Sequence, residues 1–480
     1  MILSILILLP LFGSFIILFI PPKQFFLIRL ISIIISLEIF IMSILLWIFF
    51  DTGYSNFQFC EVLFWGYGEL MLGIDGLSIF LIILTTFLIP LCLLVNWNNS
   101  LNFKNYAVNF LLIESFLIFI FSILDLLIFY IFFESVLIPM FLIIGLGGSS
   151  KRKIRSSYFF FFYTLVGSSL MLLSIIFILF KIGTLNYLIL TNIYLKESIQ
   201  NILWVGFIFA FMSKIPMIPF HIWLPEAHVE APTGGSVLLA GILLKLGTYG
   251  ILRFLIPLFS YSSFYFLPII FSLSGISIIY TSGTAIRQTD LKRIIAYTSI
   301  AHMNIVVISL FVLKIISLEG SLFQMLSHGL VSSSLFFCIG FFYDRYHTRI
   351  IENFGGNVQF LPLLSFFFFI FTLANLAFPI TCNFVGEFLM LVGIFEENFL
   401  ISVISSLGML LSGAYSLWVF NRICFGNIKS IFTYDLIYFE FFILGFLAFF
   451  IIFFGIFPTF LTNIMTASIY NFKYLLEFKI

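Results

Sequence analysis

The sequence predicts an all-α polytopic membrane protein. Hydrophobic residues make up 62% of the 480-residue chain and charged residues only 9%. Apolar runs of about 18 or more residues recur from one end to the other, and each is long enough to cross a hydrocarbon core of about 30 Å as a helix. A membrane β-barrel would instead alternate polar and apolar residues over strands of roughly ten residues. That alternation is absent, so the apolar runs are expected to be transmembrane helices.

The apolar runs divide the chain into about fourteen expected spans, separated by polar, glycine and proline residues. The first span lacks a basic leader and a small-residue cleavage site, so we expect a retained helix and not a secretory signal. The spans cover residues 2–20, 25–50, 76–95, 107–123, 125–146, 156–181, 202–224, 236–256, 264–283, 291–313, 318–343, 361–395, 400–422 and 436–458.

Two of these spans are expected to be broken helices. The seventh span contains Pro216 and Pro219, and the twelfth is interrupted by Pro379, followed by Thr381 and Asn383. Proline removes a backbone donor and clashes with the preceding turn. Within a membrane such a break is tolerated only where protein or a water-filled cavity satisfies the freed groups. Broken helices of this kind are typical of transporters.

A faint internal repeat relates two parts of the chain. LVGSSL at 165–170 resembles LVSSSL at 330–335, and the segment beginning at Gly241 resembles that beginning at Gly408. Five helices would then be followed by five more in inverted topology, because each unit has an odd number of spans. The expected organisation is N-terminal helices in 1–106, a first repeat in 107–256, a second in 264–422, and a last transmembrane helix with a C-terminal tail in 436–480.

The basic residues predict the orientation of the chain. Most of the 22 Lys and Arg residues fall in alternate connections, which the positive-inside rule places on the inner side of the membrane, with both termini outside. The heavy use of Phe and Ile, and the absence of an Arg-rich transit segment, favour an organelle-encoded protein. The inner residues are Lys23, Arg29, Lys104, Lys151, Arg152, Lys153, Arg155, Arg287, Lys292, Arg293, Arg345, Arg349, Arg422 and Lys429.

Four charged residues lie deep inside the expected spans: Glu134, Lys214, Lys245 and Glu387. A charge near the middle of the bilayer costs roughly 2.5–3.5 kcal/mol on insertion scales. Ionisable groups of both signs on separate helices therefore indicate a protein that conducts charge or protons. Pairing Glu134 with Lys214 would keep both charged, whereas separating them would favour the neutral form of each, so that a proton could be loaded or expelled.

Structural explanations of the same residues stay open. Glu134 and Lys214 could form a fixed ion pair that joins two helices. Lys245 lies about ten residues from either end of its helix, too far for its ammonium to reach the interface easily. His302 and His328 suit a relay between a lysine and a glutamate, but each could simply bond two helices together.

His221 and His228, with Glu226 between them, have a spacing that could hold a metal. No third convergent ligand is apparent, so we expect ordinary loop structure there and no metal site. The five cysteines are scattered without a CxxC pair, and no glycine-rich phosphate loop is present. The chain is therefore expected to bind no cofactor and to carry no redox centre.

Several long segments resemble the chain 4 family of antiporter-like membrane subunits in respiratory complex I, the proton-pumping NADH:ubiquinone oxidoreductase. The resemblance extends from about residue 70 to 458, and HIWLPEAHVEAPTGGSV is its most specific part. That motif is part of the longer segment SKIPMIPFHIWLPEAHVEAPTGGSVLLAGILLKLGTYG. The other segments are FFESVLIPMFLIIG, RQTDLKRIIAYTSIAHMN, LSHGLVSSSLFF and NFVGEFLMLVG.

The resemblance implies a proton-translocating core subunit of the membrane arm, with fourteen helices, inverted five-helix repeats and a polar axis in the membrane. The residues expected to act as a proton relay are Glu134, Lys214, Lys245, His302, His328 and Glu387. NAD, FMN, iron–sulfur clusters and ubiquinone would be bound elsewhere in the complex. The expected partners are other membrane-arm and peripheral-arm subunits, including neighbouring antiporter-like subunits, and lipids, but no nucleic acid. The expected location is the mitochondrial inner membrane.

Two other functions remain open from the sequence. The chain could belong to a secondary sodium/proton antiporter, although a sodium site would favour more carboxylates, and here lysines dominate. It could also be a structural spacer whose buried charges only hold a membrane arm together. A terminal relay group at Glu387 would need water beside it, and Gly386 is expected to leave room for that water.

Overall fold

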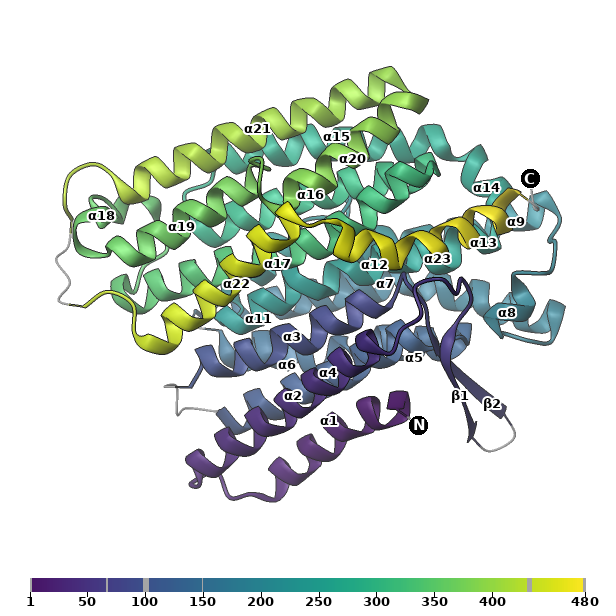
Figure 1. The fold of residues 1–480 in the computed structure, drawn as a ribbon, viewed down its shortest axis with the longest axis horizontal. Coiled ribbons are helices and arrows are strands. Elements are labelled where there is room, and N and C mark those ends of the chain that lie inside the picture. The colour runs from purple at the N-terminus through teal and green to yellow at the C-terminus, as the bar shows by residue number, and fades with distance from the viewer. Residues whose placement is uncertain (1, 66–67, 98–102, 149, 430–433, 478–480) are drawn as a thin grey trace.

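The computed structural model describes residues 2–65, 68–97, 103–148, 150–429 and 434–477. Parts of the predicted N-terminal segment (1, 66–67, 98–102) and of the C-terminal tail (478–480) lie outside these residues. The described chain is a bundle of long, nearly parallel helices with one β-hairpin at one end (Figure 1). The predicted all-α polytopic fold is confirmed for the bundle, and the hairpin is an addition to it.

Eleven helices of the described residues are long and apolar enough to cross a membrane. Each coincides with one of the predicted spans. The three remaining predicted spans correspond to a shorter apolar helix, α3, and to the two interrupted helices, α9 with α10 and α19 with α20. The predicted breaks at the proline residues are therefore present.

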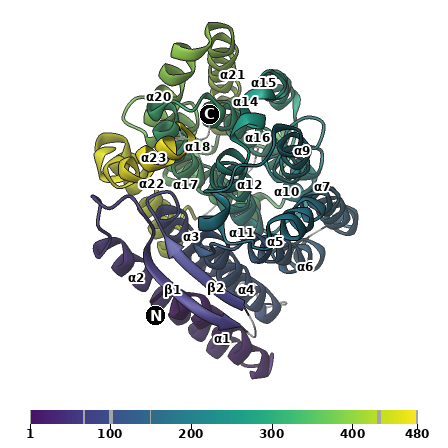
Figure 2. The same ribbon diagram turned by 90° about the vertical axis from the view of Figure 1, so that its right-hand side faces the viewer.

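The N-terminal part of the chain contains four helices and the hairpin. The hairpin strands are antiparallel, with Glu61 opposite Leu72 and Leu63 opposite Leu70. The strands, of 8 and 7 residues, are shorter than the about 9–11 residues of a membrane-spanning strand, and they cross one end of the neighbouring helices (Figure 2). These elements are α1 (Ile2–Phe19), α2 (Phe25–Ile48), β1 (Gln58–Trp65), β2 (Gly68–Ile74), α3 (Ile79–Val95) and α4 (Phe103–Ser122).

The middle of the chain contains the first interrupted helix and a long helix with π-helical turns. Asp125 begins α5 by accepting hydrogen bonds from the N–H groups of Leu127 and Ile128, which is typical of an N-cap. Gly183 ends α7 in the left-handed conformation (φ 85°), where a glycine is favoured. The elements are α5 (Leu126–Ser135), α6 (Leu137–Gly147), α7 (Lys153–Ile182), α8 (Tyr187–Leu190), α9 (Glu197–Lys214), α10 (Trp223–Glu230), α11 (Thr233–Leu238), η1 (Leu239–Leu243), α12 (Leu244–Gly250), η2 (Ile251–Leu255) and α13 (Ile256–Leu258).

The last part of the chain contains the second interrupted helix. Asp290 caps α16 by accepting a hydrogen bond from the N–H of Lys292. Residues 459–477, predicted as part of a tail, form the helix α23. The elements are α14 (Ser260–Tyr265), α15 (Leu267–Arg287), α16 (Leu291–Val312), α17 (Ile315–Tyr346), η3 (Ile351–Asn353), α18 (Asn357–Phe360), α19 (Pro362–Asn375), α20 (Cys382–Glu397), α21 (Phe399–Cys424), α22 (Tyr438–Ile456) and α23 (Thr459–Glu477).

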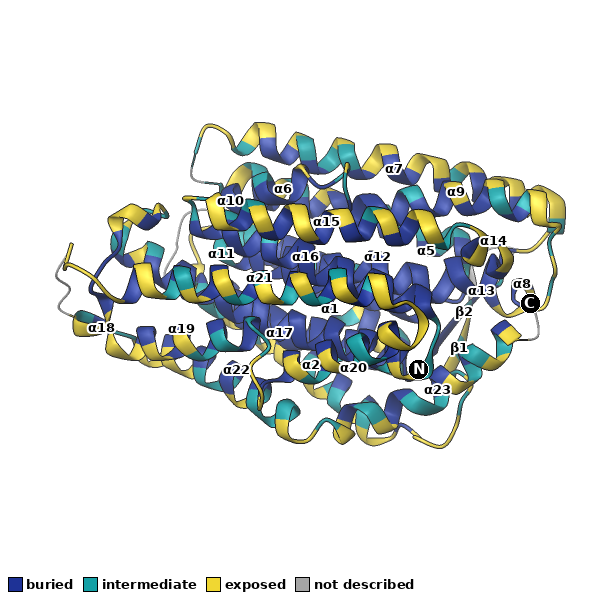
Figure 3. Cartoon of the chain, turned by 90° about the horizontal axis from the view of Figure 1, so that it is seen from above, coloured by how far each residue is buried: buried dark blue, intermediate teal, exposed yellow. Residues whose placement is uncertain are grey.

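The centre of the bundle is formed by α16, α17 and the continuous helix from α11 to α13, which we call the central helix (233–258). These helices are almost wholly buried, whereas α2, α7, α15 and α21 expose apolar side chains on their outer faces (Figure 3). Exposed apolar surface of this extent suits contact with lipid or with another membrane protein. The buried ionisable residues thus lie where lipid cannot reach them.

The two ends of the bundle differ. The first and last described residues and the hairpin lie at one end, called the hairpin end, whereas α18 lies at the other (Figure 1). The second end carries the basic connections predicted to face inward, and we call it the basic end. This arrangement agrees with the predicted even number of membrane crossings.

Candidate functional site

The first break places Lys214 inside the protein. α9 ends at Lys214, and Trp223 begins α10. The indole Nε1 of Trp223 donates to the carbonyl of Ser213 at 2.9 Å, which holds the two half-helices together. Lys214 is only 4% exposed, and its Nζ donates to the carbonyl of Phe133 at 3.2 Å and lies 4.4 Å from the centre of the Phe133 ring. A carbonyl and an aromatic face both stabilise a buried ammonium.

Glu134 lies near the end of α5, next to the residue that holds Lys214. Its side chain is half-buried, and Oε1 is buried without a hydrogen-bond partner among the described residues. The charges of Glu134 and Lys214 interact electrostatically, but no oxygen of Glu134 lies within 4.0 Å of Lys214 Nζ. The structure therefore brings the two predicted partners into the same region without the direct ion pair that would fix them together.

Lys245 lies at the centre of the bundle, on the central helix between two π-helical stretches. Single π-helical turns are rare and are frequently found at functional sites. The side chain is fully buried, and its Nζ donates to the carbonyl of Ala240 at 2.6 Å and lies 2.9 Å from Nδ1 of His328. The predicted neighbourhood of Lys245 and a histidine is thus present as a direct contact.

His302 and Glu387 continue this row of side chains. The ring centre of His328 on α17 lies 5.8 Å from that of His302 on α16. Nδ1 of His302 lies 2.8 Å from Oε1 of Glu387 on α20, although the two groups are not aligned as a hydrogen bond. All three side chains are at most 2% exposed. Four side chains therefore form one continuous series, which we call the buried row: Lys245, His328, His302 and Glu387.

The surroundings of Glu387 correct one expectation. Nε2 of Gln324 donates to Oε1 of Glu387 at 3.2 Å, and Ser327 donates to Oε1 of Gln324 at 3.0 Å. A Cβ on Gly386 would lie 2.4 Å from Oε1 of Gln324 and 3.0 Å from its Cα. Gly386 therefore makes room for α17, and the prediction that it leaves room for water is wrong.

Further buried polar atoms without a partner among the described residues surround the row. They are the side-chain atoms of Asn383, Oε2 of Glu387, the Tyr415 hydroxyl, Oδ1 of Asn304, and the hydroxyls of Ser299 and Ser332. Buried polar groups are usually hydrogen-bonded to protein or to ordered water. A group of such unpaired polar atoms around the buried row is expected where side chains exchange hydrogen-bond partners as protons move.

His228 is a candidate that the sequence analysis placed wrongly. It was expected in a loop, but it lies inside α10, fully buried, with its ring stacked 4.7 Å from that of Phe336. Neither ring nitrogen has a hydrogen-bond partner among the described residues, and His228 interacts electrostatically with His328 and with Lys292. Lys292 is also buried, and its Nζ donates to the carbonyl of Ala231 at 2.7 Å. These two residues extend the buried row toward the basic end.

Near His221, the Glu226 carboxylate pairs with Arg293 at 2.7 Å. Across the described ranges, no group of three or more His, Cys, Asp and Glu side chains could hold a metal ion.

A buried ion pair joins the central helix to Asp75 toward the hairpin end. Arg253 contacts Asp75 at 2.5 Å and donates through Nε to the hydroxyl of Tyr249 at 3.2 Å. Its guanidinium also lies over the rings of Phe57 and Tyr187, at 4.9 and 5.7 Å from their centres. Sequence reasoning missed this pair because Asp75 and Arg253 lie far apart in the chain and at or near the ends of their expected spans, where a charge is not conspicuous.

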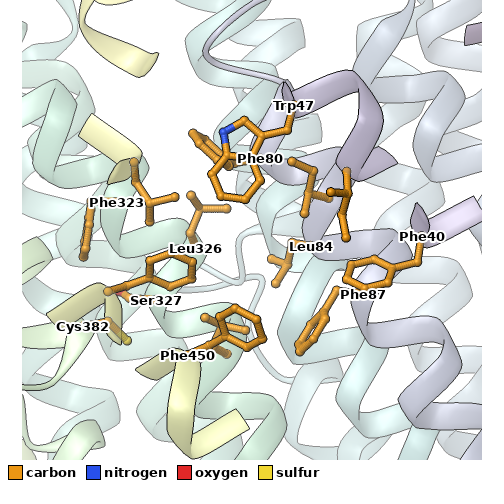
Figure 4. Close-up of a pocket in the computed structure, with 15 residues that line it drawn as sticks. Phe40, Trp47, Phe80, Leu84, Phe87, Phe323, Leu326, Ser327, Cys382 and Phe450 are labelled. Carbon is orange, nitrogen blue, oxygen red and sulfur yellow. The ribbon is translucent and has the colours of Figure 1, made fainter. Parts of the chain in front are cut away.

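An apolar cavity of about 120 Å³ lies beside the buried row, between α2, α3, α17 and α22 (Figure 4). Rings such as Phe40, Phe87 and Phe450 line it, and Ser327 and Cys382 border it on the side of the row. These walls offer almost no hydrogen-bonding groups. The cavity therefore lies next to the polar row without being part of it.

The interrupted helices and the buried row define a membrane protein of the antiporter-like class. The family described as NADH:quinone oxidoreductase/Mrp antiporter, TM, matches residues 124–412. NADH-ubiquinone oxidoreductase chain 4 of Marchantia polymorpha is 53% identical, with 98% of this chain and 96% of the relative covered. The chain 4 protein of Arabidopsis thaliana is 52% identical over the same shares. The chain belongs to the NADH-ubiquinone oxidoreductase chain 4 family, as the motifs predicted.

Solved structures agree with this assignment. A chain of respiratory complex I from Thermus thermophilus with bound NADH has a TM-score of 0.90 at 27% identity, and the match covers 99% of this chain and 100% of that chain. A chain of the Mrp complex from Dietzia sp. DQ12-45-1b has a TM-score of 0.89 at 16% identity, with 100% and 99% covered. At this low identity, the match to the Mrp complex chain shows a shared fold only.

Proposed function

We propose that this chain is a proton-translocating core subunit of the membrane arm of respiratory complex I, where it couples NADH-to-ubiquinone electron transfer to proton pumping. The observation that carries the proposal is the buried row, whose four side chains come from four helices. Lys245 Nζ lies 2.9 Å from His328, the rings of His328 and His302 have centres 5.8 Å apart, and His302 lies 2.8 Å from Glu387. Intramembrane ionisable groups of this kind are expensive to bury and are typical of proton relays.

A proton can pass along the row in balanced steps. The Lys245 ammonium loses an N–H proton to Nδ1 of His328 across 2.9 Å, which leaves a neutral amine and an imidazolium. The imidazolium passes a proton to His302, which in turn protonates the Glu387 carboxylate across 2.8 Å. Histidine suits the middle positions because its two nitrogens can accept a proton on one side and release one on the other.

The region of Glu134 and Lys214 would act as the control on this row. Because no direct ion pair joins the two side chains, a small movement of α5 or of the half-helix end of α9 could close or open the pair. Closing it stabilises both charges, and opening it favours neutral groups in an apolar surrounding. The end of α9 packs against the central helix beside Lys245, since a Cβ on Gly247 would lie 2.4 Å from Cγ1 of Ile215. Such a movement would change the electric field at Lys245, which is how we propose that redox energy reaches the row.

The remaining assignments follow from this function. The protein would act as a subunit of a translocating NADH:ubiquinone reductase without holding a redox centre itself. NAD, FMN, iron–sulfur clusters and ubiquinone would be bound by other subunits. The partners would be peripheral-arm subunits and neighbouring antiporter-like subunits, and the location would be the mitochondrial inner membrane, with the gene in the organelle.

The proposal is tested by purifying the protein from its native membrane under mild detergent. We expect it to migrate with subunits that contain flavin and iron–sulfur clusters, in a particle that reduces ubiquinone with NADH and acidifies one side of a reconstituted membrane. Purification with hydrophobic subunits alone, together with sodium-driven proton movement that NADH does not affect, would instead establish a secondary antiporter.

A further inference from the structure

Glu114 is a buried carboxyl group that the relay described above does not use. It lies on α4, is 0% exposed, and neither side-chain oxygen has a hydrogen-bond partner among the described residues. A buried carboxylate without a partner is strongly unfavourable, so such a group is held as a neutral acid unless a positive charge comes near it. Its presence in an otherwise apolar helix face therefore needs an explanation.

The face of α4 that carries Glu114 is turned toward the central helix. Phe110, Glu114, Leu117 and Phe121 follow at helical spacings of four, three and four residues, and so form one stripe. At one end of the stripe, a Cβ on Gly234 would lie 3.3 Å from Cζ of Phe110.

At the other end of the stripe, the ring of Phe121 lies 5.2 Å from that of Tyr249, whose hydroxyl donates to the carbonyl of Phe121 at 3.2 Å. Both contacts reach the central helix, and Glu114 lies between them on the same stripe.

The same two contacts give the depth of Glu114. It follows Phe110 by about 6 Å of helix and precedes Phe121 by about 10 Å, at 1.5 Å per residue. Measured along the central helix from Gly234 and from Tyr249, this is the level of residues 238–242. The π-helical stretch lies at that level, and its Ala240 carbonyl accepts the hydrogen bond from Lys245 Nζ.

Lys245 likewise lacks a charged partner. Its ammonium contacts a carbonyl and a histidine, but no carboxylate of the described chain lies within 4.0 Å of Nζ. An unpaired base and an unpaired acid thus lie at the same depth on facing helices.

We propose that Glu114 and Lys245 share one proton, so that Glu114 is a second proton donor and acceptor for the buried row. This inference rests on the proposed function. In one state Glu114 is a neutral acid and Lys245 a neutral amine. In the other state the O–H bond of Glu114 has broken and an N–H bond of Lys245 has formed, directly or over a bridging water, which leaves a carboxylate and an ammonium.

Both states have the same net charge, which is zero, and this removes the main cost of charging Lys245 in the middle of the protein. A lone ammonium there would be penalised by several kcal/mol, whereas the carboxylate formed at the same moment compensates for it. When Lys245 passes this proton to His328, Glu114 is left as a carboxylate and Lys245 as a neutral amine. Glu114 then takes up the next proton from water, and its O–H bond breaks again as an N–H bond forms on Lys245.

The experiment uses the complete complex with three variants of α4. We expect Glu114→Gln to lower NADH-driven proton flux by about tenfold or more, because an amide cannot transfer the proton. Glu114→Asp should restore most of the flux. The matched control is Asn109→Leu, which removes a buried polar group from another face of the same helix and should leave the flux close to that of the wild type.

Infrared difference spectroscopy provides a second readout that a packing role would not change. A carbonyl band of a protonated carboxyl group should change between the oxidised and the NADH-reduced complex, and this change should be missing in Glu114→Gln. In Lys245→Met the change in this band should also be lost, because the carboxyl group can no longer exchange a proton with Lys245. A wild-type spectrum without any carboxyl band that responds to reduction would contradict the inference even if a variant fails to assemble.

Two results would overturn the inference: wild-type flux in an assembled Glu114→Gln complex, or a wild-type spectrum without any carboxyl band that responds to reduction and depends on Glu114. If Glu134→Gln blocks pumping while Glu114→Gln does not, only the role of Glu114 is lost. If both variants pump normally, the proposed function itself fails.

Discussion

At the scale of single residues, the buried row shows how the protein can keep ionisable groups away from water. Lys245 contacts a carbonyl and an imidazole, and Glu387 contacts Gln324 and lies against His302. Each group therefore has one or two polar neighbours but not a complete set. Groups held in this way can change protonation without breaking a rigid ion pair, which is what a relay needs.

Glu387 ends the row, and its substitution distinguishes a relay group from a packing group. Glu387→Lys should keep partial activity, because a lysine can still accept and release a proton beside its neighbours. Glu387→Ala should lose much more, since alanine leaves a gap in the row and strands Gln324. The measurement is the number of protons moved per NADH in reconstituted membranes, with assembly checked separately. A normal ratio in the alanine variant would reduce Glu387 to a helix-packing carboxyl.

The sequence alone identified the members of the row because charge is conspicuous in an apolar run. Lys245 and Glu387 needed no structure to be recognised as candidates. His228 was missed, since it follows a proline-rich break that resembles a loop and only the folded chain packs its ring on Phe336. Glu114 is charged and central as well, but one carboxyl on a helix carries no hint of the face that it occupies until its neighbours are known.

At the scale of helices, the two breaks position the charges. The first ends α9 at Lys214, and the second holds Ala377 and Ile380 in the left-handed region, with φ of 60° and 84°. Left-handed backbone at residues other than glycine costs about 1 kcal/mol or more each, so the surrounding helices must hold it in place. The proline residues in the sequence predicted the positions of both breaks. They did not predict the strained backbone conformation of the neighbouring residues.

Close packing between α17 and α20 holds Glu387 at the end of the row. Gly386→Val should destabilise the subunit by about 2 kcal/mol or more, because its side chain would meet the backbone of Gln324. Turnover should fall with it as α20 moves away. The readout is the thermal stability of the purified complex together with its NADH oxidation rate.

Gly283 in α15 provides the matched control. A Cβ there meets nothing within 4 Å. Gly283→Ala should therefore leave activity unchanged and raise helix stability by at most about 1 kcal/mol. If Gly386→Val proved equally harmless, the contact between α17 and α20 would not be what positions Glu387.

The elements that the sequence did not predict are those that depend on partners distant in the chain. The β-hairpin needs two short strands with charged residues to pair across one end of the bundle, and composition gave no reason to expect strands between membrane helices. The π-helical stretches around Lys245 likewise leave no mark in an apolar pattern. Long apolar helices, by contrast, follow from composition and length alone.

At the scale of the whole molecule, the buried row crosses the bundle inside a shell of helices whose outer faces are apolar (Figure 3). His228 and Lys292 extend it toward the basic end, and Arg253 with Asp75 lies toward the hairpin end. A protein built only as a spacer would need neither a continuous row nor polar groups leading from it toward both ends. The family of the chain, its fold and this arrangement are consistent with one function, the movement of protons.

The most direct test of that function is the proton-to-electron ratio of a complex in which Glu134 is replaced by Gln. The amide keeps the size and hydrogen bonding of the side chain, so assembly should be largely intact, but it can neither carry a charge nor release a proton. We expect Glu134→Gln to abolish most proton pumping and most ubiquinone-linked turnover. Normal proton flux per NADH in the fully assembled variant would contradict the account, because coupling through Glu134 and Lys214 would then be unnecessary.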